Sequence, residues 1–258
     1  MLRLRDGRAS EAPDVLATEE PLEVRLEGQQ VAVTMRTPGH DVELAVGFLV
    51  GEGIGRPGDV ARAVECRSEE GDGGVVDVRL RAGRAPSAGW QRNFYASSSC
   101  GVCGKASIEA VRVAAPAVPD GPEVMASVLS ELPDRMRDAQ RVFERTGGLH
   151  AAALFAPDGS VDLVREDVGR HNAVDKVVGR SALDGRLPLN GSVLVVSGRT
   201  SFEVVQKALV AGVPIVAAVS APSSLAVRLA EDANMTLVGF LRPGGFNVYA
   251  GRERIGAL

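Results

Sequence analysis

Apolar and polar residues alternate in four short stretches along the first third of the chain. Alternation with a period of two is typical of β-strands with one buried face. A short polar segment joins the members of each pair, which favours two β-hairpins over four isolated strands. The predicted strands are, in chain order, Leu22–Leu26 and Val31–Met35, then Ala61–Cys66 and Val75–Leu80, with turns at Glu27–Gln30 and Glu69–Gly74.

Between the two predicted hairpins, the spacing of apolar residues changes from two to three or four. That spacing predicts a short helix with one apolar face. Asp41 stands where a helix cap is expected. The apolar face would comprise Leu44, Ala45, Phe48 and Leu49.

In the second half of the chain, stretches that are apolar at every position alternate with helical patterns. This arrangement is typical of a parallel α/β layer. The predicted strands are His150–Phe155, Val161–Val164, Val193–Val196, Pro214–Val219 and Met235–Phe240. The predicted helices are Val124–Leu132, Asp134–Arg145 (closed by Gly147-Gly148), Val174–Leu183, Phe202–Ala211 and Ser223–Asp232.

A proline-rich stretch, Ala114–Gly121, separates the two patterns and predicts a domain boundary. We expect a flexible N-terminus over residues 1–20, because this segment is charged and lacks periodicity. A smaller, hairpin-rich subdomain would cover residues 21–118, and an α/β domain residues 119–258. The expected fold class is α/β in the second domain and α+β overall.

Composition narrows the classes of function. The 258 residues carry 29 lysines and arginines against 33 aspartates and glutamates, a net charge of −4. This balance gives no general affinity for nucleic acid or anionic membranes. No apolar stretch reaches the roughly 18 residues that span a bilayer, and Met1–Pro13 lacks the apolar core of a signal peptide. The expected compartment is the cytoplasm, where thiols stay reduced.

The segment Ser97–Lys105 places two of the three cysteines, Cys100 and Cys103, among serines and glycines. Small neighbours leave a thiol accessible to a large partner, and a cation such as Lys105 favours the reactive thiolate. Cys100 could attack the outer sulfur of a donor's persulfide, and Cys103 could receive or release that sulfur through an internal disulfide. A zinc knuckle or an inert pair is the alternative from this spacing alone. With Cys66 as the only other cysteine, a four-cysteine zinc site is excluded, and Cys66 itself is expected to be buried in its strand.

A zinc-dependent deaminase is a second metal hypothesis. Such enzymes use one histidine and two cysteines, with a glutamate two residues after the histidine. His150 is available but is followed by Ala151-Ala152, and the cysteine pair precedes it in the chain. Ser99 also replaces the usual proline before that pair. These mismatches count against deaminase chemistry, and no intrinsic metal is expected.

Charged residues crowd the stretch Arg165–Lys176, where a helix is expected to open. Asp167 and Gly169 suit the turn into this helix, whose N-terminus attracts anions. His171 is the side chain best placed for proton transfer near neutral pH. A solvated polar face is the alternative explanation.

Three loops that follow apolar strands carry residues suited to an anionic ligand. Ser197–Lys207 has the order of strand, small polar turn and helix that offers backbone amides to a phosphate, and Ser220–Ser224 repeats it. Phe240–Asn247 ends a third strand and adds a cation and an aromatic ring. Because the carboxyl ends of adjacent parallel strands meet at one sheet edge, these loops predict a site for a nucleotide-like ligand.

The motifs in this order resemble those of the formate dehydrogenase accessory sulfurtransferases. The likeness extends over nearly the whole chain after Pro21. The matching stretches are Thr37–Leu49, the cysteine loop, Gly147–Ala152, Glu166–Lys176, Ser197–Lys207, Ala221–Glu231 and Leu237–Gly245.

The resemblance implies a sulfurtransferase. Such a protein takes sulfur from a cysteine desulfurase and passes it to the bis(molybdopterin guanine dinucleotide) cofactor that formate dehydrogenase needs. The sulfur would travel as a persulfide on Cys100, with Cys103 as its companion. The resemblance also implies a cytidine-deaminase-like fold for the C-terminal part, with the cofactor-binding segment at Phe240–Gly245. The fold is expected to bring Cys100 to the rim of the cofactor pocket.

Arg242 is the only cation in the segment Phe240–Gly245. The phosphates of the cofactor would therefore also pair with Arg199, Lys207 or Arg170. The expected cofactor-binding residues are Ser197, Arg199, Ser201, Lys207, His171, Phe240, Leu241, Arg242, Pro243, Gly244 and Gly245. The expected partners are a cysteine desulfurase and the catalytic subunit of formate dehydrogenase, and an aliphatic edge strand would allow a homodimer.

Two alternative functions stay open at this point. One is a chaperone that binds the molybdenum cofactor without covalent sulfur chemistry. The other is a zinc-dependent nucleobase deaminase. His40, within Thr37–Asp41, either contacts the ligand or belongs to the turn into the first helix.

Overall fold

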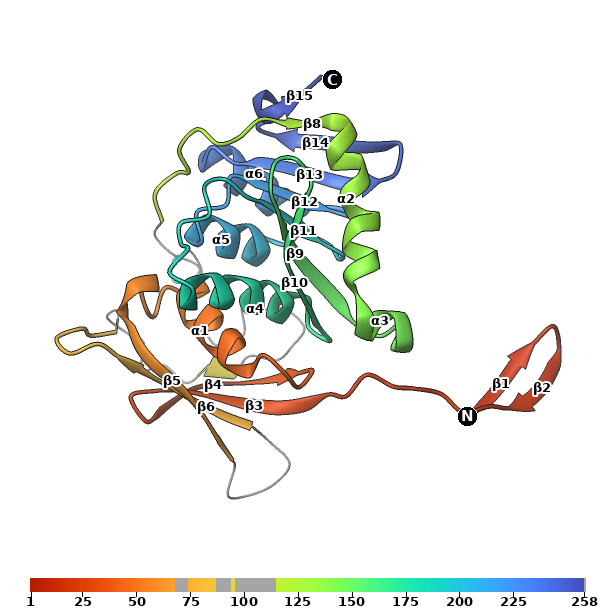
Figure 1. The fold of residues 1–258 in the computed structure, drawn as a ribbon, viewed down its shortest axis with the longest axis horizontal. Coiled ribbons are helices and arrows are strands. Elements are labelled where there is room, and N and C mark those ends of the chain that lie inside the picture. Colours follow the sequence, from red (N-terminus) through yellow and green to blue (C-terminus); the bar gives the residue numbers. More distant parts are fainter. Residues whose placement is uncertain (68–73, 87–93, 96–114, 258) are drawn as a thin grey trace.

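The computed structural model describes residues 1–67, 74–86, 94–95 and 115–257. The cysteine loop with Cys100 and Cys103 lies outside these ranges, as does most of the predicted turn Glu69–Gly74. The described chain forms two main sheets with helices between and around them (Figure 1). Its helices are α1 (Asp41–Gly51), α2 (Ala126–Ala139), α3 (Arg141–Thr146), α4 (Arg170–Leu183), α5 (Phe202–Val210) and α6 (Ser224–Asp232), with 3-10 turns η1 (Pro57–Asp59) and η3 (Arg252–Arg254).

The six-stranded sheet has the strand order β10-β9-β11-β12-β13-β14. Its strands β11, β12 and β13 are parallel, as the apolar stretches predict, whereas β9, β10 and β14 pair antiparallel with their neighbours. The layer is therefore mixed rather than parallel throughout, and the α+β class is confirmed. The strands are β9 (His150–Phe155), β10 (Val161–Asp167), β11 (Val193–Val196), β12 (Ile215–Ala218), β13 (Thr236–Arg242) and β14 (Gly245–Ala250).

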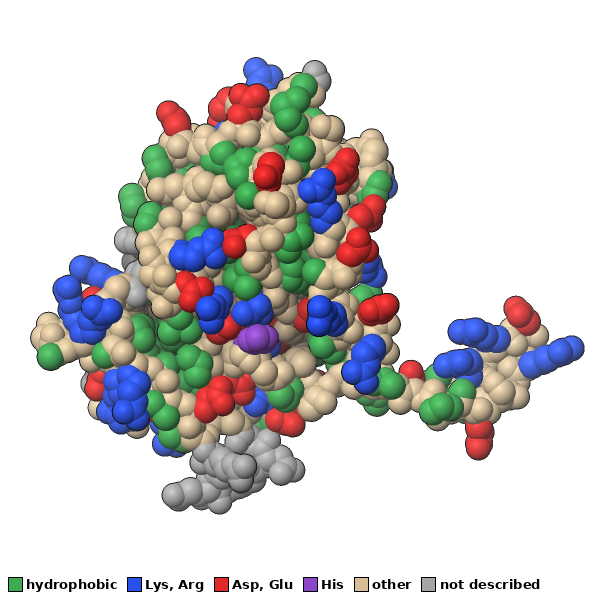
Figure 2. All heavy atoms as spheres, viewed as in Figure 1, with side chains coloured by type: hydrophobic (Ala, Val, Ile, Leu, Met, Phe, Trp, Pro, Cys, Tyr) green, Lys and Arg blue, Asp and Glu red, His purple; other side chains and the backbone are tan. Residues whose placement is uncertain are grey.

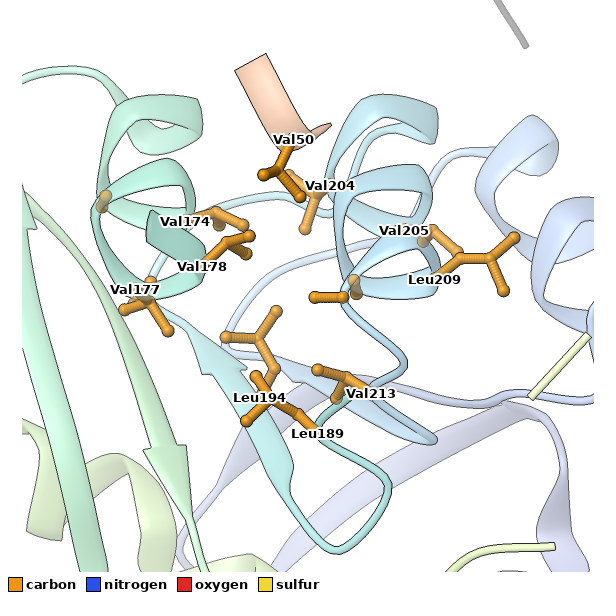
Figure 3. Close-up of a cluster of buried hydrophobic side chains, with 14 of the residues drawn as sticks. Val50, Val174, Val177, Val178, Leu189, Leu194, Val204, Val205, Leu209 and Val213 are labelled. Atoms are coloured by element: carbon orange, nitrogen blue, oxygen red, sulfur yellow. The ribbon is translucent and has the colours of Figure 1, made fainter. Parts of the chain in front are cut away.

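Alternate residues of this sheet face two separate hydrophobic clusters. On one face, Leu194 of β11 lies with Val178 of α4 and Val204 of α5 (Figure 3). On the other face, Val195 belongs to the cluster that includes Leu129 of α2. A strand with helices on both faces buries every side chain, which explains why β11 and β12 are apolar at each position.

The five-stranded sheet has the order β5-β6-β3-β4-β7. Both predicted hairpins are confirmed, since β3 pairs antiparallel with β4 and β5 with β6. A parallel pairing of β3 with β6 joins the hairpins into one sheet. The strands are β3 (Glu20–Leu26), β4 (Gln29–Arg36), β5 (Val60–Arg67), β6 (Gly74–Leu80) and β7 (Phe94–Tyr95). Two separate strand pairs, β1 (Leu2–Arg5) with β2 (Arg8–Glu11) and β8 (Val124–Met125) with β15 (Ile255–Gly256), complete the described fold.

Helix α1 joins the two sheets by packing closely against α4 (Figure 1). A Cβ atom built on Gly47 would lie 1.8 Å from the carbonyl oxygen of Asp175, and one on Gly179 would lie 1.8 Å from that of Glu43. Glycine at both positions lets the two backbones touch. One hydrophobic cluster consequently runs from Leu22 in the first sheet to Leu237 in the second, and the boundary predicted near residue 118 stays a prediction.

The helix boundary predicted at Pro133 is wrong. Helix α2 continues through Pro133, and the break falls at Gln140 instead. Leu129, Leu132 and Met136 lie along one buried face of α2 on both sides of the proline. Burial of this face compensates for the backbone hydrogen bond that proline cannot donate. Gly147 closes α3 in the left-handed conformation, with φ 64°, as its position predicts.

Two further predictions from the N-terminal half are wrong. Asp41 does not cap α1: the N-cap is His40 in the left-handed conformation, and the Asp41 carboxylate lies 2.8 Å from Nη2 of Arg36. Cys66 is exposed rather than buried. It lies near the end of β5, the outermost strand of the described five-stranded sheet, where β5 and β6 extend past the helices (Figure 1).

Candidate functional site

Loops from four strands of the mixed sheet meet at one of its edges. The hydroxyl of Ser197, after β11, accepts a hydrogen bond from the backbone N–H of Ala151 in β9 (2.9 Å). After β12, the N–H of Ser223 donates to the carbonyl of Thr200 (2.9 Å). The N–H of Phe240 in β13 donates to the carbonyl of Ser220 (3.1 Å). These bonds confirm that the predicted loops lie together, and we call this place the sheet-edge site.

Three helices begin at the sheet-edge site. Ser223 caps α6 by accepting a hydrogen bond from the N–H of Ala226 (3.2 Å). Ser201 precedes α5 but makes no such cap, because its hydroxyl lies 3.0 Å from Nε2 of His171. No side chain caps α4 at Gly169 either. The first N–H groups of α4 and α5 are therefore candidate donors for an anion.

The charged stretch at the start of α4 is a buried network and not a solvated face. Asp167 is 0% exposed, and its carboxylate lies 2.7 Å from Nζ of Lys176. The same carboxylate accepts hydrogen bonds from the N–H groups of Thr37 (3.1 Å) and Gly169 (2.8 Å). Asn172 donates to Asp167 as well. This network ties the segment after β4 to the start of α4.

His171 is buried and neutral at physiological pH. Burial, with the nearby cations of Arg170 and Lys207, lowers the pKa of His171 from the ordinary 6.5 to about 4. An imidazole with this pKa can hold Ser201 in place, but it does not titrate near neutral pH. The prediction that His171 is poised for proton transfer near neutral pH is therefore wrong.

Replacing His171 by glutamine is expected to flatten the pH dependence of stability. The unfolded chain binds a proton with a pKa near 6.5 and the folded protein with a pKa of about 4, so acid favours the unfolded state across that interval and stability falls as pH falls. Glutamine does not titrate and removes this contribution. Urea unfolding at several pH values between 4 and 7 checks it, and parallel pH profiles for the wild type and His171→Gln would count against it.

Two of the predicted cofactor-binding side chains face the interior. Lys207 is buried, with Nζ 2.8 Å from Oδ1 of Asp175 and 3.3 Å from Oε1 of Glu52. Burial alone would lower the pKa of Lys207, but these two carboxylates raise it above the usual range for lysine. Leu241 is 0% exposed and packs in the cluster beneath α2. The predictions of phosphate pairing for Lys207 and ligand contact for the Leu241 side chain are wrong, because both point into the core.

The remaining predicted cations and the aromatic ring are accessible. Arg199 and Arg242 are exposed, as are Pro243 and Gly244 in the turn between β13 and β14. Phe240 is 42% exposed and has a φ of 52°. A positive φ is strained for a bulky residue and is often retained at a ligand site. Gly245 is partly exposed at the start of β14.

Two buried polar groups near this edge have no partner in the described residues: one on Thr200, which sequence patterns did not single out, and one on Arg170, which was expected to pair with phosphates. Thr200 is 0% exposed, and its Oγ1 has no hydrogen-bond partner in the described part of the chain. The same holds for the buried Nε of Arg170. A Cβ atom on Gly198 would lie 3.3 Å from Nδ1 of His150 and 3.6 Å from Cδ of Arg170, so these side chains line the same turn. Burial and the charge of Arg170 lower the pKa of His150.

Within the described ranges, no three histidine, cysteine, aspartate or glutamate side chains are grouped to hold a metal ion. The helices of the same ranges are too short or too polar to cross a membrane. The sheet-edge site itself presents helix N-termini, serines and arginines. Such a set is typical of a site for an anionic ligand, so the class is an α+β protein with a candidate anion site at the edge of a mixed sheet.

Comparison with known proteins narrows this class. Residues 17–256 match the FdhD/NarQ family, and the chain therefore belongs to this family. A protein of Streptomyces coelicolor named sulfur carrier protein FdhD is 56% identical, over 99% of this chain and 94% of that protein. A protein of the same name from Mycobacterium tuberculosis is 54% identical, over 94% of this chain and 92% of that protein. The predicted resemblance is confirmed.

A solved structure is similar over its whole length. It is a crystal structure from Desulfotalea psychrophila, assigned as a formate dehydrogenase accessory protein. It aligns with a TM-score of 0.76 and 25% sequence identity, over 99% of this chain and 96% of the other. The fold built around the sheet-edge site is thus shared with a protein described as a formate dehydrogenase accessory protein.

Proposed function

We propose that this protein is a sulfurtransferase that carries sulfur for the maturation of formate dehydrogenase. Membership of the FdhD/NarQ family and the full-length similarity to proteins named sulfur carrier protein FdhD are the main support. The chain supplies the chemistry that a carrier needs, a Cys-x-x-Cys pair in a segment of small residues. In this proposal the donor is a cysteine desulfurase and the acceptor is the bis(molybdopterin guanine dinucleotide) cofactor.

The step that loads sulfur onto Cys100 is a thiol–persulfide exchange, in which atoms and electrons balance. The thiolate of Cys100 attacks the outer sulfur of the donor's persulfide, the donor's S–S bond breaks, and the donor cysteine leaves as a thiolate. Cys100 then carries one sulfane sulfur, with no net oxidation. Release of this sulfane sulfur from Cys100 as hydrosulfide needs two electrons. Cys103 supplies them by attacking the inner sulfur, which leaves a disulfide between Cys100 and Cys103.

The path of the chain supports a thiol that works at the sheet-edge site. Strand β7 ends at Tyr95 and runs parallel to β4, with Tyr95 opposite Val33. The chain beyond β4 leads to Thr37, which binds the start of α4. Cys100 follows Tyr95 by five residues, which reach at most about 17 Å when extended. The proposal has the thiol approach the start of α4 across this short segment.

The sheet-edge site offers groups that match a guanine dinucleotide. The exposed guanidinium of Arg199, the unpartnered Nε of Arg170 and the N–H groups at the starts of α4 and α5 would bind its phosphates. The exposed ring of Phe240 would stack on a guanine. The single observation that carries the sulfurtransferase proposal is the Cys-x-x-Cys pair in a chain of the family that contains proteins named as sulfur carriers.

Cys100→Ala is expected to abolish formate dehydrogenase activity in cells that depend on this protein, because the persulfide then has no carrier. Cys66→Ala is the matched control, since Cys66 is exposed but lies outside the Cys-x-x-Cys pair, and it should leave activity unchanged. Formate oxidation in extracts of complemented cells measures both. Full activity with Cys100→Ala would remove Cys100 from the mechanism.

A chaperone that only binds the molybdenum cofactor is the second candidate, and the sheet-edge site favours it equally. It predicts that the double replacement of Cys100 and Cys103 is tolerated while replacement of Arg199 and Arg242 is not. The sulfurtransferase predicts that both double variants are inactive. The same cellular assay separates the two functions. A nucleobase deaminase, the third alternative, would require stoichiometric zinc in the purified protein.

A further inference from the structure

A second surface lies at the opposite end of α4 from the sheet-edge site. Two hollows of about 340 and 310 Å³ border the turn η1, and the end of α4 lines the first of them. Gly58 and Val60 line the first hollow, and Asp59, between them in sequence, lines the second. We call the two hollows together the η1 surface.

Four arginines line the η1 surface and one carboxylate opposes them. Arg62 and Arg81 line the first hollow, and Arg56 and Arg84 the second. All four are exposed. Blue side chains gather at this flank of the molecule, at the left of the view (Figure 2). Among the described residues, Asp59 is the only acidic one that lines either hollow. This positive surface belongs to a chain whose net charge is −4.

With respect to the described residues, three of the four guanidinium groups have no ion pair. Arg84 lies 3.2 Å from Oδ1 of Asp59, so this pair is internally neutralised. Arg81 donates through Nε to the carbonyl of Val60 (3.3 Å), which leaves its charge uncompensated. Among the described residues, Arg56 and Arg62 have no ion pair. Three positive charges on the η1 surface are therefore available to a partner.

The floor of the first hollow is aliphatic. Val46 of α1, Val60 of β5, Ala182 of α4 and Leu187 in the segment after α4 line it, and they belong to or border the main hydrophobic cluster. Leu183 adds a large side chain that is 42% exposed. An apolar floor beneath a rim of arginines suits a ligand that combines carboxylates with an aliphatic or aromatic side chain.

We propose that the η1 surface binds an acidic segment of a partner protein. Its carboxylates would pair with Arg62, Arg81 and Arg56, and one of its apolar side chains would fill the first hollow. A peptide segment fits better than a small molecule because the cations are divided between two hollows. Ala61 and Arg62 belong to β5, the outermost strand in the described part of its sheet, and an extended segment can add to such an edge.

This docking surface is separate from the sheet-edge site. Helix α4 has 14 residues and is about 21 Å long, with the sheet-edge site at its start and the η1 surface at its end. A partner docked on the η1 surface would leave the sheet-edge site open. The protein could then hold its ligand and a partner at the same time.

Fluorescence anisotropy with a fluorescein-labelled peptide of alternating glutamate and leucine tests the proposal on the full chain. The wild type is expected to bind it, with affinity falling as salt rises. Arg62→Glu with Arg81→Glu should weaken binding by about tenfold or more. Arg228→Glu with Arg252→Glu is the matched control, because it makes the same charge change at two exposed positions elsewhere, and it should bind like the wild type.

Three results would overturn the proposal. One is equal affinity of the wild type and the Arg62→Glu, Arg81→Glu variant for the glutamate–leucine peptide. Another is binding of a lysine–leucine peptide at least as tight, or no binding of the acidic peptide below about 1 mM. The third is tighter binding of a single-stranded oligonucleotide, which would make the surface a nucleic-acid site. Because the substituted arginines are exposed, both variants should fold, and thermal melts monitor this.

Discussion

Gly179→Ala is expected to be the most damaging single substitution in this protein. The new Cβ would lie 1.8 Å from the carbonyl oxygen of Glu43 and 2.7 Å from the backbone nitrogen of Gly47. Both are backbone atoms of α1, so no rotamer change can relieve the clash and the helices must separate. Overpacking of this kind costs about 3 kcal/mol or more, a large part of a typical domain's stability.

Gly191→Ala is the matched control for this prediction. No heavy atom lies within 4 Å of a Cβ at Gly191, and its φ is not in the left-handed region. Gly191→Ala should change the free energy of unfolding by no more than about 0.5 kcal/mol. Urea unfolding measures both variants. A Gly179→Ala protein with nearly wild-type stability would show that α1 and α4 do not touch as closely as described.

Lys176→Met is expected to have the second largest effect. It leaves the carboxylate of Asp167 fully buried without its cation, and it removes the bond from Nζ to the carbonyl of Thr37 (2.9 Å). Removing one partner of a buried ion pair costs about 3–5 kcal/mol. Adding Asp167→Asn should restore part of the loss, because the uncompensated charge is then gone.

Arg180→Met on the same helix is the control. Arg180 also pairs with an aspartate, Asp184, at 2.8 Å, but both side chains are exposed to solvent. Such a pair contributes at most about 1 kcal/mol. The difference between the two substitutions in urea unfolding isolates the effect of burial. Equal losses of unfolding free energy for Lys176→Met and Arg180→Met would mean that the Lys176–Asp167 pair is accessible to water.

These two contacts matter for function because they hold the halves of the molecule together. The glycine contact fixes α1 against α4, and the Thr37–Asp167–Lys176 network fixes the end of β4 against the start of α4. The proposed sulfur transfer requires a thiol from the N-terminal half to reach a ligand bound by the C-terminal half.

Local periodicity predicted most of the secondary structure correctly. The strands β3, β4, β5, β6, β9 and β11 lie within a few residues of the predicted stretches, because each shows a clear period of two or an unbroken apolar run. Pro133 misled the helix prediction, since burial of the residues on either side outweighs its local effect. The pairing of β3 with β6 was beyond local pattern, because it joins residues about 50 positions apart.

The candidate site was predictable in outline but not in detail. Strand order places the loops after β11, β12 and β13 at one edge, and sequence alone indicated this. Lys207 appeared to be a phosphate ligand because its sequence position cannot reveal Asp175 and Glu52 beside it. The low pKa of His171 likewise depends on burial. The unpartnered Oγ1 of Thr200 has no signature in the sequence.

Intact-mass spectrometry tests the central claim most directly. The purified protein would be incubated with a cysteine desulfurase and cysteine, then measured before and after reduction with a thiol reagent. The proposed function predicts a mass gain of one sulfur atom that is lost on reduction, absent from Cys100→Ala and retained in Cys66→Ala. A gain that persists in Cys100→Ala, or no gain in the wild type, would contradict it.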